Sequence, residues 1–320
     1  MKFRCERDAL SEALGTAQRA VGSRGGALPV LSGVLLELQH DQLVVTGTDL
    51  ELTIRTSTPV DGGGVGSAVL PARLLGDIIR SVEPGVVSME VLDDEARISA
   101  GRSEFTVRTL GVGEFPRQPE PEGEGVTIDA ASFSEALRQV IPAASKDDAR
   151  PILTGILLAA EGEGVRLVAT DSYRLAVRDL PAERILAAEE RVLIPARGLS
   201  EVQRLLGSGS LRVLLSDRDA SFHLSNARVT TRLIEGQFPN YRQLLPSSYP
   251  NHLTVSREGL LDAVRRVRLV TQGRENTPVR LSLSVSGIEL DVQAHEVGQA
   301  HEIIEGKYEG EEMVVAFNPD

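Results

Sequence analysis

Pro29-Val30-Leu31-Ser32-Gly33-Val34-Leu35-Leu36 returns 122 residues later as Pro151-Ile152-Leu153-Thr154-Gly155-Ile156-Leu157-Leu158. The same offset relates Thr48-Asp49 to Thr170-Asp171. Self-similarity of long period decides the domain plan of a chain before any local feature does. Because a period of this length is the size of a whole domain, the sequence predicts a tandem of similar domains rather than a solenoid of small units.

A third copy begins near Leu253, where the apolar spacing that opens the first two copies recurs. The chain ends at Asp320, a little over half a repeat later. We expect either a fragment of a longer chain or a protein that has lost half a domain. We favour the fragment, because half a domain leaves apolar faces and sheet edges uncovered. The turn-rich stretches 116–125 and 246–251 place the boundaries, which gives domains 1–120, 121–247 and 248–320, the last an N-terminal half only.

Composition excludes several classes of protein. The 320 residues are 41% hydrophobic and 25% charged, as in folded soluble proteins. Cys5 is the single cysteine, so no disulfide forms within the chain and a reducing compartment is indicated. The N-terminus has no apolar signal core and no stretch approaches a membrane span, so we predict a cytoplasmic protein.

The charge distribution qualifies the net charge of −12, which by itself argues against a nucleic-acid partner. Residues 254–274 carry five arginines against two acids, and residues 1–27 carry five basic residues against three acids. Both stretches are the helical openings of repeats. This repeated basic excess favours an anionic partner on the helices, while the alternative is that each arginine only solubilises a helix face. The low aromatic content of 3%, with no tryptophan, argues against a binder of single strands by stacking.

The hydrophobic pattern predicts an α+β fold. Apolar residues alternate in 2–7, as in a half-buried strand, and then follow helical spacing from Leu10 to Val21. Three strands follow in each repeat, and a second helix starts at Pro71 and at Pro195, because proline suits a first helical turn. Three further strands come after each second helix. Each complete repeat is therefore expected to consist of two strand–helix–three-strand halves.

A set of short motifs along the whole chain resembles one family. The chain resembles the beta subunit of bacterial DNA polymerase III, the beta sliding clamps. The motifs that carry the resemblance are Met1–Phe3, Leu28–Leu31, Thr46–Glu51, Val168–Ala176, Gly236–Arg242, Tyr308–Gly310 and Phe317-Asn318.

The resemblance implies a non-catalytic processivity subunit. It implies a head-to-tail homodimeric ring of six similar domains, with helices lining the hole and sheets outside, which suits closure by a twofold axis. Such a ring encircles duplex DNA, slides without sequence specificity and tethers the replicative polymerase. The implied partners are double-stranded DNA, a second copy of the chain, the polymerase III alpha subunit, the clamp loader and other proteins with a clamp-binding motif. No cofactor, metal or membrane is implied, and the implied location is the replication fork.

By position, Arg24, Arg73 and Arg197 match family residues that face DNA. Arg73 and Arg197 are also equivalent to each other in the repeat. Phosphate contacts supply attraction without sequence specificity and so permit sliding. The alternative for each is an ordinary solvated arginine at the start of a helix.

The second repeat departs from the first after its Thr-Asp pair, where Thr48-Asp49 leads to Leu50-Glu51-Leu52 but Thr170-Asp171 leads to Ser172-Tyr173-Arg174-Leu175. In the family this segment helps to build a pocket for a short hydrophobic peptide. The carried-over pocket residues are Arg150, Leu153, Thr170, Ser172, Tyr173, Arg174, Leu175, Pro239, Leu244 and Asn318. The alternative is that the leucines are ordinary core and Thr170-Asp171 only a turn. Tyr173 departs from the smaller or imidazole side chain often found there. Family residues that finish the pocket lie beyond Asp320, so we expect a site open on one side.

The resemblance also assigns a dimer interface. Phe105 and Val107 of one chain are matched with Leu269 and Val270 of the other. Arg102 and Arg108 are placed to face acids such as Glu296 and Glu302. Exposed ion pairs of that kind contribute about 0–1 kcal/mol each, so we expect the apolar contact to dominate.

Three alternatives stay open beside the clamp: an enzyme, a DNA-independent β-rich interaction scaffold, and an inactive clamp fragment. The sequence has no phosphate-binding glycine loop, nucleophile elbow or dinucleotide motif. His295 and His301, six residues apart, lack the spacing and the carboxylate or thiol companions of a metal site. Asp49 and Asp171 recur in both repeats, which indicates a structural turn rather than catalysis. A scaffold would not need the arginine-rich helices.

Overall fold

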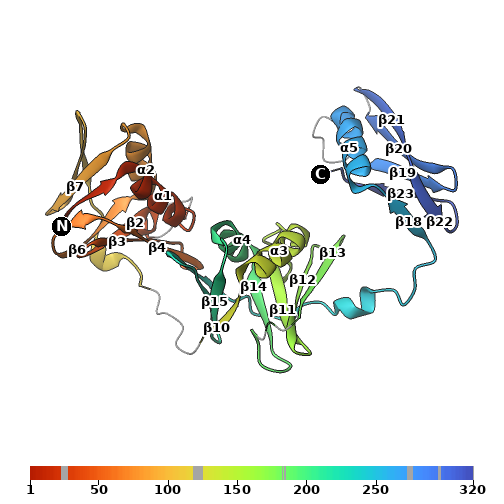
Figure 1. Cartoon of the computed structure of the whole chain (residues 1–320), viewed down its shortest axis with the longest axis horizontal. Helices are drawn as coiled ribbons and strands as arrows, with labels where there is room; N and C mark the ends of the chain where they lie inside the picture. The colour runs from red at the N-terminus through yellow and green to blue at the C-terminus, as the bar shows by residue number, and fades with distance from the viewer. Residues whose placement is uncertain are drawn as a thin grey trace. The chain divides into compact units, whose positions relative to one another are not determined.

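The computed structural model describes residues 1–22, 28–117, 125–181, 183, 185–271, 277–294 and 297–319. Its contacts divide the chain into two compact units, Met1–Pro239 and Asn240–Asp320 (Figure 1). The first unit holds the first two repeats, and the second unit holds the third. The α+β class predicted from the sequence is confirmed, and the three units of sequence repeat each combine helices with antiparallel sheets.

The first repeat has two helices against two sheets. Its elements in order are β1 (Lys2–Glu6), α1 (Arg7–Gln18), β2 (Gly33–Gln39), β3 (Gln42–Thr48), β4 (Leu52–Pro59), β5 (Asp61–Gly62), β6 (Val65–Pro71), α2 (Ala72–Ser81), β7 (Val86–Leu92), β8 (Glu95–Ala100) and β9 (Ser103–Arg108). The predicted alternation in β1 is real, because Phe3 and Cys5 are buried and their neighbours are exposed. Helix α1 packs beside α2, and both helices bury an apolar face in one core with strands of the two sheets.

The second repeat follows the same plan. Its elements are β10 (Val126–Asp129), α3 (Ala130–Val140), β11 (Gly155–Glu161), β12 (Gly164–Thr170), β13 (Leu175–Leu180), β14 (Arg191–Pro195), α4 (Ala196–Leu205), β15 (Ser210–Leu215), β16 (Asp219–His223) and β17 (Ala227–Arg232). The Asp129 carboxylate caps α3 by accepting a hydrogen bond from the Ser132 N–H at 2.7 Å, a standard way to satisfy a first-turn donor. Helices α3 and α4 pack against each other as α1 and α2 do.

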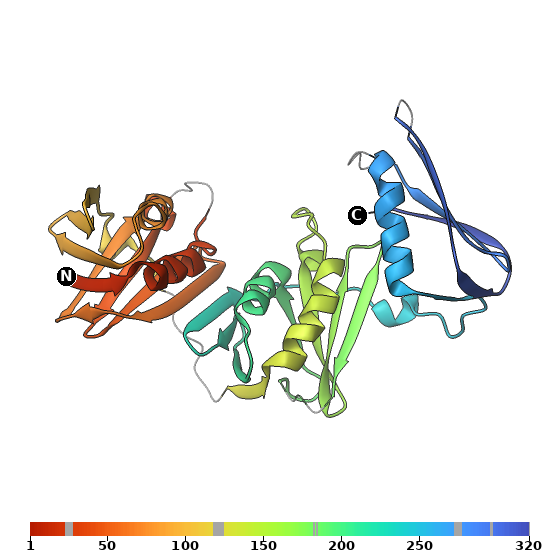
Figure 2. The same ribbon diagram turned by 45° about the horizontal axis from the view of Figure 1, so that its top comes forward.

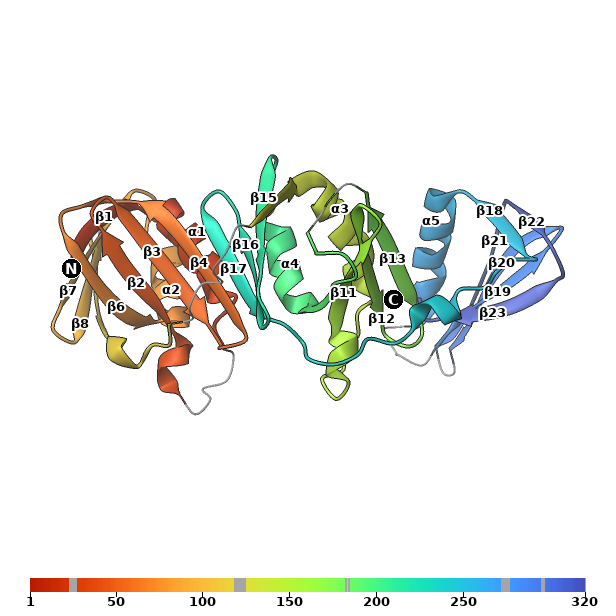
Figure 3. The same cartoon turned by 90° about the horizontal axis from the view of Figure 1, so that it is seen from below.

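The two repeats of the first unit share a sheet. Strand β17 pairs with β4 over residues 227–231 and 52–56, which joins half of each repeat into eight strands ordered β10-β15-β16-β17-β4-β3-β2-β6 (Figure 3). The core is continuous beneath this junction, because Leu52 and Ile54 of the first repeat pack in the same cluster as Phe133 and Phe222 of the second. Shared backbone hydrogen bonds and shared core explain why the two repeats form one compact unit.

The third repeat forms the second unit. It contains β18 (His252–Val255), α5 (Arg257–Arg268), β19 (Val279–Ser284), β20 (Gly287–Ala294), β21 (Gly298–Ile304), β22 (Gly306–Glu309) and β23 (Met313–Phe317). Helix α5 lies against the sheet β21-β20-β19-β23, as the blue ribbon in Figure 2 shows. The Ser256 hydroxyl caps α5 by accepting from the Gly259 N–H at 3.3 Å.

The second helix of each complete repeat begins one residue after the proline that was expected to open it. Pro71 and Pro195 are the last residues of β6 and β14, and the helices begin at Ala72 and Ala196. Both prolines still pair in the sheet, opposite Gly33 and Gly155. Each lies on a strand at one end of the sheet order, where a missing N–H is tolerated.

Candidate functional site

The Thr170–Leu175 segment is a tight turn held by side chains. The Asp171 Oδ1 atom accepts hydrogen bonds from the backbone N–H groups of Tyr173 at 2.9 Å and Arg174 at 3.0 Å. The buried Thr170 hydroxyl donates to the Arg174 carbonyl at 2.7 Å, and Ser172 adopts a φ of 82°. The interpretation of Asp171 as a structural turn residue is confirmed, because its carboxylate satisfies the turn's own backbone donors.

The charge of Asp171 is stabilised within this turn. Burial raises the pKa of its carboxyl, but the backbone donors of Tyr173 and Arg174 and the Arg174 guanidinium outweigh burial and lower it. The Arg174 Nε atom lies 3.0 Å from Asp171 Oδ2. The side chain of Arg174 is thereby oriented over the turn.

Arg150 connects the turn to the preceding loop. Its Nη1 donates to the Ser172 hydroxyl at 3.1 Å, and its Nε donates to the Asp147 carboxylate at 2.8 Å. The backbone N–H of Ala149 and the Arg150 guanidinium lower the pKa of Asp147. The structure therefore brings Arg150, Thr170, Ser172 and Arg174 together in one hydrogen-bonded group.

The apolar residues assigned to the pocket are not buried within their own units. Tyr173 is 94% exposed, while Leu153 and Leu175 are half-buried and Pro239 is exposed. In the second unit, Leu244 is 64% exposed and Asn318 is exposed after β23. The reading of these leucines as ordinary core is wrong, because none of the three lies in the buried core of its unit.

The first repeat has the same turn at Thr48–Leu52, but the second carboxylate oxygen of its aspartate contacts a different partner. Asp49 Oδ1 accepts from the N–H groups of Glu51 at 3.1 Å and Leu52 at 2.8 Å, and Leu50 has a φ of 79°. Its Oδ2 instead pairs with the guanidinium of Arg197, from the first turn of α4 in the second repeat. Asp49 therefore fastens one repeat to the next.

The three arginines expected to face DNA have different settings. Arg73 is exposed in the first turn of α2. Arg197 holds the equivalent place in α4 and pairs with Asp49, with about half of its side chain exposed. Arg24 lies outside the described residues. Sequence reasoning did not find the ion pair of Arg197, because its partner lies 148 residues away.

The expected interface residues are described one by one. Phe105 and Val107 lie on β9, which ends its sheet in the described part of the chain. Val107 is buried in its own repeat, whereas Leu269 is 77% exposed and Val270 is half-buried after α5. Glu302 is held by the Arg266 guanidinium of its own repeat, with 3.0 Å between Nε and Oε2. Glu296 lies outside the described residues.

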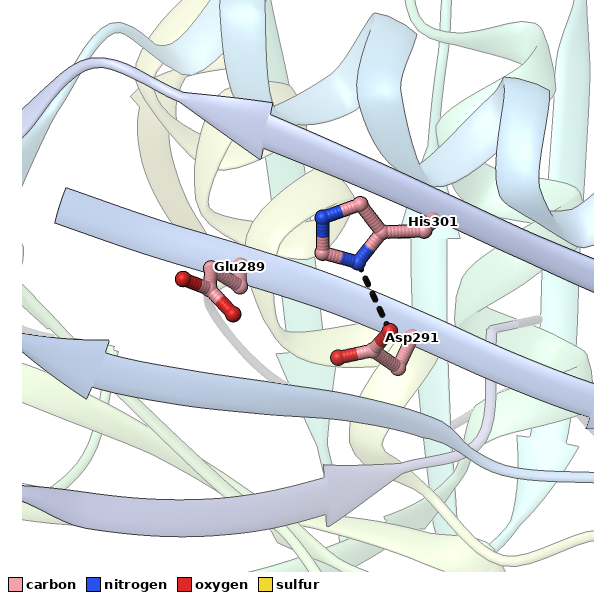
Figure 4. Close-up of side chains that lie close together, drawn as sticks. All are labelled: Glu289, Asp291 and His301. Carbon is pink, nitrogen blue, oxygen red and sulfur yellow. Dashed lines mark hydrogen bonds and ion pairs between the residues drawn. The ribbon is translucent and has the colours of Figure 1, made fainter.

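One histidine has carboxylate neighbours that the sequence did not predict. His301 Nδ1 lies 2.8 Å from Asp291 Oδ1, and the donor atoms of Glu289, Asp291 and His301 all lie within 4.8 Å of one another (Figure 4). The expectation that His301 lacks such companions is wrong, because β21 places it directly opposite Asp291 of β20. The hydrogen bond that the His301 ring donates to Asp291 raises the pKa of His301. Three donors on a largely exposed sheet surface do not by themselves establish a metal site.

Comparisons with known proteins cover all three repeats. Residues 1–119, 127–240 and 242–320 match the N-terminal, central and C-terminal domain models of the DNA polymerase III beta subunit. The beta sliding clamp of Streptomyces coelicolor is 36% identical over 100% of this chain and 86% of its own length.

The chain belongs to the beta sliding clamp family.

Other family members agree with this assignment. The beta sliding clamp of Micrococcus luteus is 34% identical over 95% of this chain and 98% of its own length. A solved sliding clamp from Bartonella birtlesii, bound to griselimycin, has a TM-score of 0.91 at 28% identity, covering 100% of this chain and 87% of that one. The predicted function of a DNA sliding clamp in polymerase processivity is thereby confirmed. No helix in the described residues has the length and apolar character needed to cross a membrane.

Proposed function

We propose that this clamp works as a head-to-tail homodimeric ring around duplex DNA and docks its partners through a peptide pocket in the second repeat. It acts without catalysing a reaction, as three clamp domains with the boundaries 1–120, 121–247 and 248–320. The polymerase III alpha subunit, the clamp loader and other clamp-binding proteins are its proposed protein partners. The observation that carries the docking proposal is the group of Arg150, Thr170, Ser172 and Arg174 beside an exposed Tyr173.

This arrangement suits a short hydrophobic peptide. Half-buried Leu153 and Leu175 offer apolar contact, while the polar groups of Arg150 and Ser172 lie at the edge. Peptides that bind in grooves insert apolar anchors and are oriented by polar groups at the rim. Leu244 and Asn318, from the second unit, are proposed as further contacts.

A matched pair of variants tests the pocket. Tyr173→Ala removes an exposed ring from the second-repeat turn, and Glu51→Ala changes the equivalent position of the first. Fluorescence anisotropy with a labelled hydrophobic clamp-binding peptide measures both. We expect Tyr173→Ala to weaken binding about tenfold, as loss of an aromatic anchor does, and Glu51→Ala to bind as wild type. An affinity unchanged by Tyr173→Ala, Arg150→Ala and Ser172→Ala together contradicts the pocket.

The DNA-facing role of Arg24, Arg73 and Arg197 is proposed on position and charge. Arg73 and Arg197 stand exposed at the starts of equivalent helices. Loading onto nicked circular DNA should fall in the Arg73→Ala/Arg197→Ala variant, and it should depend less steeply on salt than in wild type, because each lost phosphate contact removes part of the salt dependence. Asp49→Asn is the control, since it removes the partner of Arg197 and keeps the arginine. Equal loading by the double variant and wild type contradicts the assignment.

The proposed interface pairs Phe105 and Val107 with Leu269 and Val270 of a second copy. Phe105 is half-buried and Leu269 is exposed, so both side chains have solvent-accessible surface. Phe105 packs against the core cluster that contains Val107. Sedimentation equilibrium over a concentration series should show a dimer. Leu269→Asp should raise the dimer dissociation constant at least tenfold, whereas Leu74→Asp, at an exposed leucine of α2, should not.

A further inference from the structure

The second helix of each complete repeat carries an arginine at the same place, and the first repeat holds one of the two. Arg73 is exposed in the first turn of α2. Arg197, in the first turn of α4, pairs through Nη1 with the Asp49 carboxylate. Its Nη2 atom lies 3.5 Å from the carbonyl oxygen of Arg19, at the end of α1. Helix α4 lies nearer the first repeat than α3 does (Figure 1), so these contacts cross the junction between the repeats.

The turn at Thr48–Leu52 directs one oxygen of Asp49 toward Arg197. The Oδ1 atom of Asp49 already accepts hydrogen bonds from the N–H groups of Glu51 and Leu52. Its Oδ2 atom contacts Arg197, and only 17% of the Asp49 side chain is exposed, against 54% of the Arg197 side chain. Solvent and salt screen a partly buried charge poorly. Asp49 is therefore a fixed anion beside a cation that still reaches solvent.

The junction between the repeats has other contacts besides this ion pair. Strand β17 pairs with β4, and the core is continuous beneath the two strands. A second ion pair also crosses the junction, with 3.6 Å between Arg19 Nη1 and Oε2 of Glu201. Glu201 is a buried residue of α4, one turn after Arg197. Arg197 can therefore leave Asp49 while the two repeats stay joined.

The pair with Asp49 changes what Arg197 can offer a phosphate group. A guanidinium binds phosphate through its positive charge and several N–H donors. Asp49 neutralises that charge and occupies an Nη1 donor. A phosphate must either displace the carboxylate or bind a neutralised pair, and both weaken the contact. Because affinity for the DNA backbone depends on the number of phosphates that are neutralised, Arg197 should contribute less than an unpaired arginine would.

We propose that Asp49 competes with DNA phosphate for Arg197 and thereby limits the affinity of the second repeat for the duplex. This rests on the proposed DNA-facing role of Arg197, and it adds an acidic residue of the first repeat to that site. The competing anion belongs to the chain itself, so it is always present beside the guanidinium. A phosphate contact that is readily exchanged suits a protein that slides along DNA.

Fluorescence anisotropy of a labelled duplex of random sequence, measured with the full chain at several salt concentrations, tests the competition. Asp49→Asn removes the charge but keeps an oxygen for the N–H groups of Glu51 and Leu52. It should bind DNA about two- to fivefold more tightly than wild type, the range that one exposed ion pair spans. The slope of log affinity against log salt should become steeper by up to about 0.9, the share of one phosphate contact.

Asp171→Asn is the matched control for the loss of one negative charge. Asp171 holds the equivalent turn of the second repeat and pairs with Arg174 of its own turn. The control variant should bind DNA as wild type does. A gain in DNA affinity equal to that of Asp49→Asn overturns the proposal, because it would follow from net charge alone.

Double variants show whether the effect passes through Arg197. Asp49→Asn should give no gain in DNA affinity when it is added to Arg197→Ala. It should give the full gain when it is added to Arg73→Ala, which keeps Arg197. A gain that persists without Arg197 overturns the proposal.

The single variants distinguish failure of the competition from failure of the DNA-facing role. If Arg197→Ala weakens DNA binding and Asp49→Asn does not strengthen it, Arg197 contacts DNA but Asp49 does not compete, and the proposal is overturned. If Arg197→Ala binds DNA as wild type does, the DNA-facing role is contradicted and the competition with it. Thermal unfolding checks that each variant is folded. Asp49→Ser, whose hydroxyl can also accept from the N–H groups of the turn, serves as a second uncharged variant.

Discussion

The turns after β3 and β12 have one backbone and two uses. In both, a buried threonine hydroxyl accepts a hydrogen bond from the backbone N–H two residues later, that of Leu50 at 3.1 Å and that of Ser172 at 3.2 Å. In both, the aspartate Oδ1 accepts from the backbone N–H groups of the second and third residues after the aspartate. The residue after the aspartate has positive φ in each. The outer oxygen differs: Asp49 Oδ2 pairs with Arg197 of the next repeat, and Asp171 Oδ2 pairs with Arg174 of its own turn.

This difference teaches where a repeated fold is free to diverge. The threonine and the aspartate satisfy backbone donors, so they recur. The side chains at the two outward positions do not have to satisfy these backbone donors. These positions are Leu50 and Glu51 in one turn and Ser172 and Tyr173 in the other. One copy thus serves the junction between repeats, and the other presents an exposed aromatic residue.

The largest effect on the free energy of unfolding is expected at the position in β3 and β12 where one strand has Gly47 and the other has Ala169. A Cβ at Gly47 would clash with the backbone carbonyl of Ala17, a buried residue in the last turn of α1. Gly47→Ala should therefore lower the free energy of unfolding by about 3 kcal/mol, since neither backbone gives way easily. The equivalent residue is buried Ala169, where Ala169→Gly should cost about 1 kcal/mol. Urea denaturation measures both, and equal effects would break the comparison.

Loss of the aspartates comes next. Asp49→Ala and Asp171→Ala each remove a side chain that satisfies two backbone donors, which should cost about 1–2 kcal/mol, as for a lost helix cap. Asp49→Ala should cost more, because Arg197 also loses its partner. Peptide affinity should fall in Asp171→Ala only. Urea denaturation and peptide anisotropy on the same samples check both statements, and loss of peptide binding in Asp49→Ala would contradict them.

Acid should reveal the charge on Asp171. Because its pKa is lowered in the folded protein, its contribution to stability is present above the ordinary pKa of about 3.9 and is lost as pH falls through the lowered value. Wild type should therefore lose more stability between pH 5 and pH 2.5 than Asp171→Asn. Thermal unfolding across that range measures the difference. Parallel curves for the two proteins would show that Asp171 does not carry this linkage.

The smallest effect is expected from exchanging the outward residues. Tyr173→Glu and Glu51→Tyr should each change the free energy of unfolding by less than about 0.5 kcal/mol, since both positions are exposed. Urea denaturation checks this. A larger loss in either would show that the outward side chain supports its turn, and would remove the basis for free divergence.

The local structure of this chain was readable from its sequence. The offset of 122 residues gave the repeats, and the alternation at Phe3 and Cys5 gave the first strand. The Thr-Asp pairs indicated turns correctly, because a short side chain that bonds the next few N–H groups is a local device. The resemblance placed Arg150, Thr170, Ser172 and Arg174 in one group, and the structure brings them together.

Only the tertiary structure decided which strands meet across the repeats. Four arrangements join residues on different strands or repeats. They are the pairing of β17 with β4, the ion pair of Arg197 with Asp49, the alignment of side chains across neighbouring strands from Arg212 to Arg55, and the hydrogen-bonded pair of His301 with Asp291. A strand edge offers the same N–H and C=O groups whatever its side chains, so its sequence does not name its partner. The register that aligns these side chains follows from the shared core beneath them.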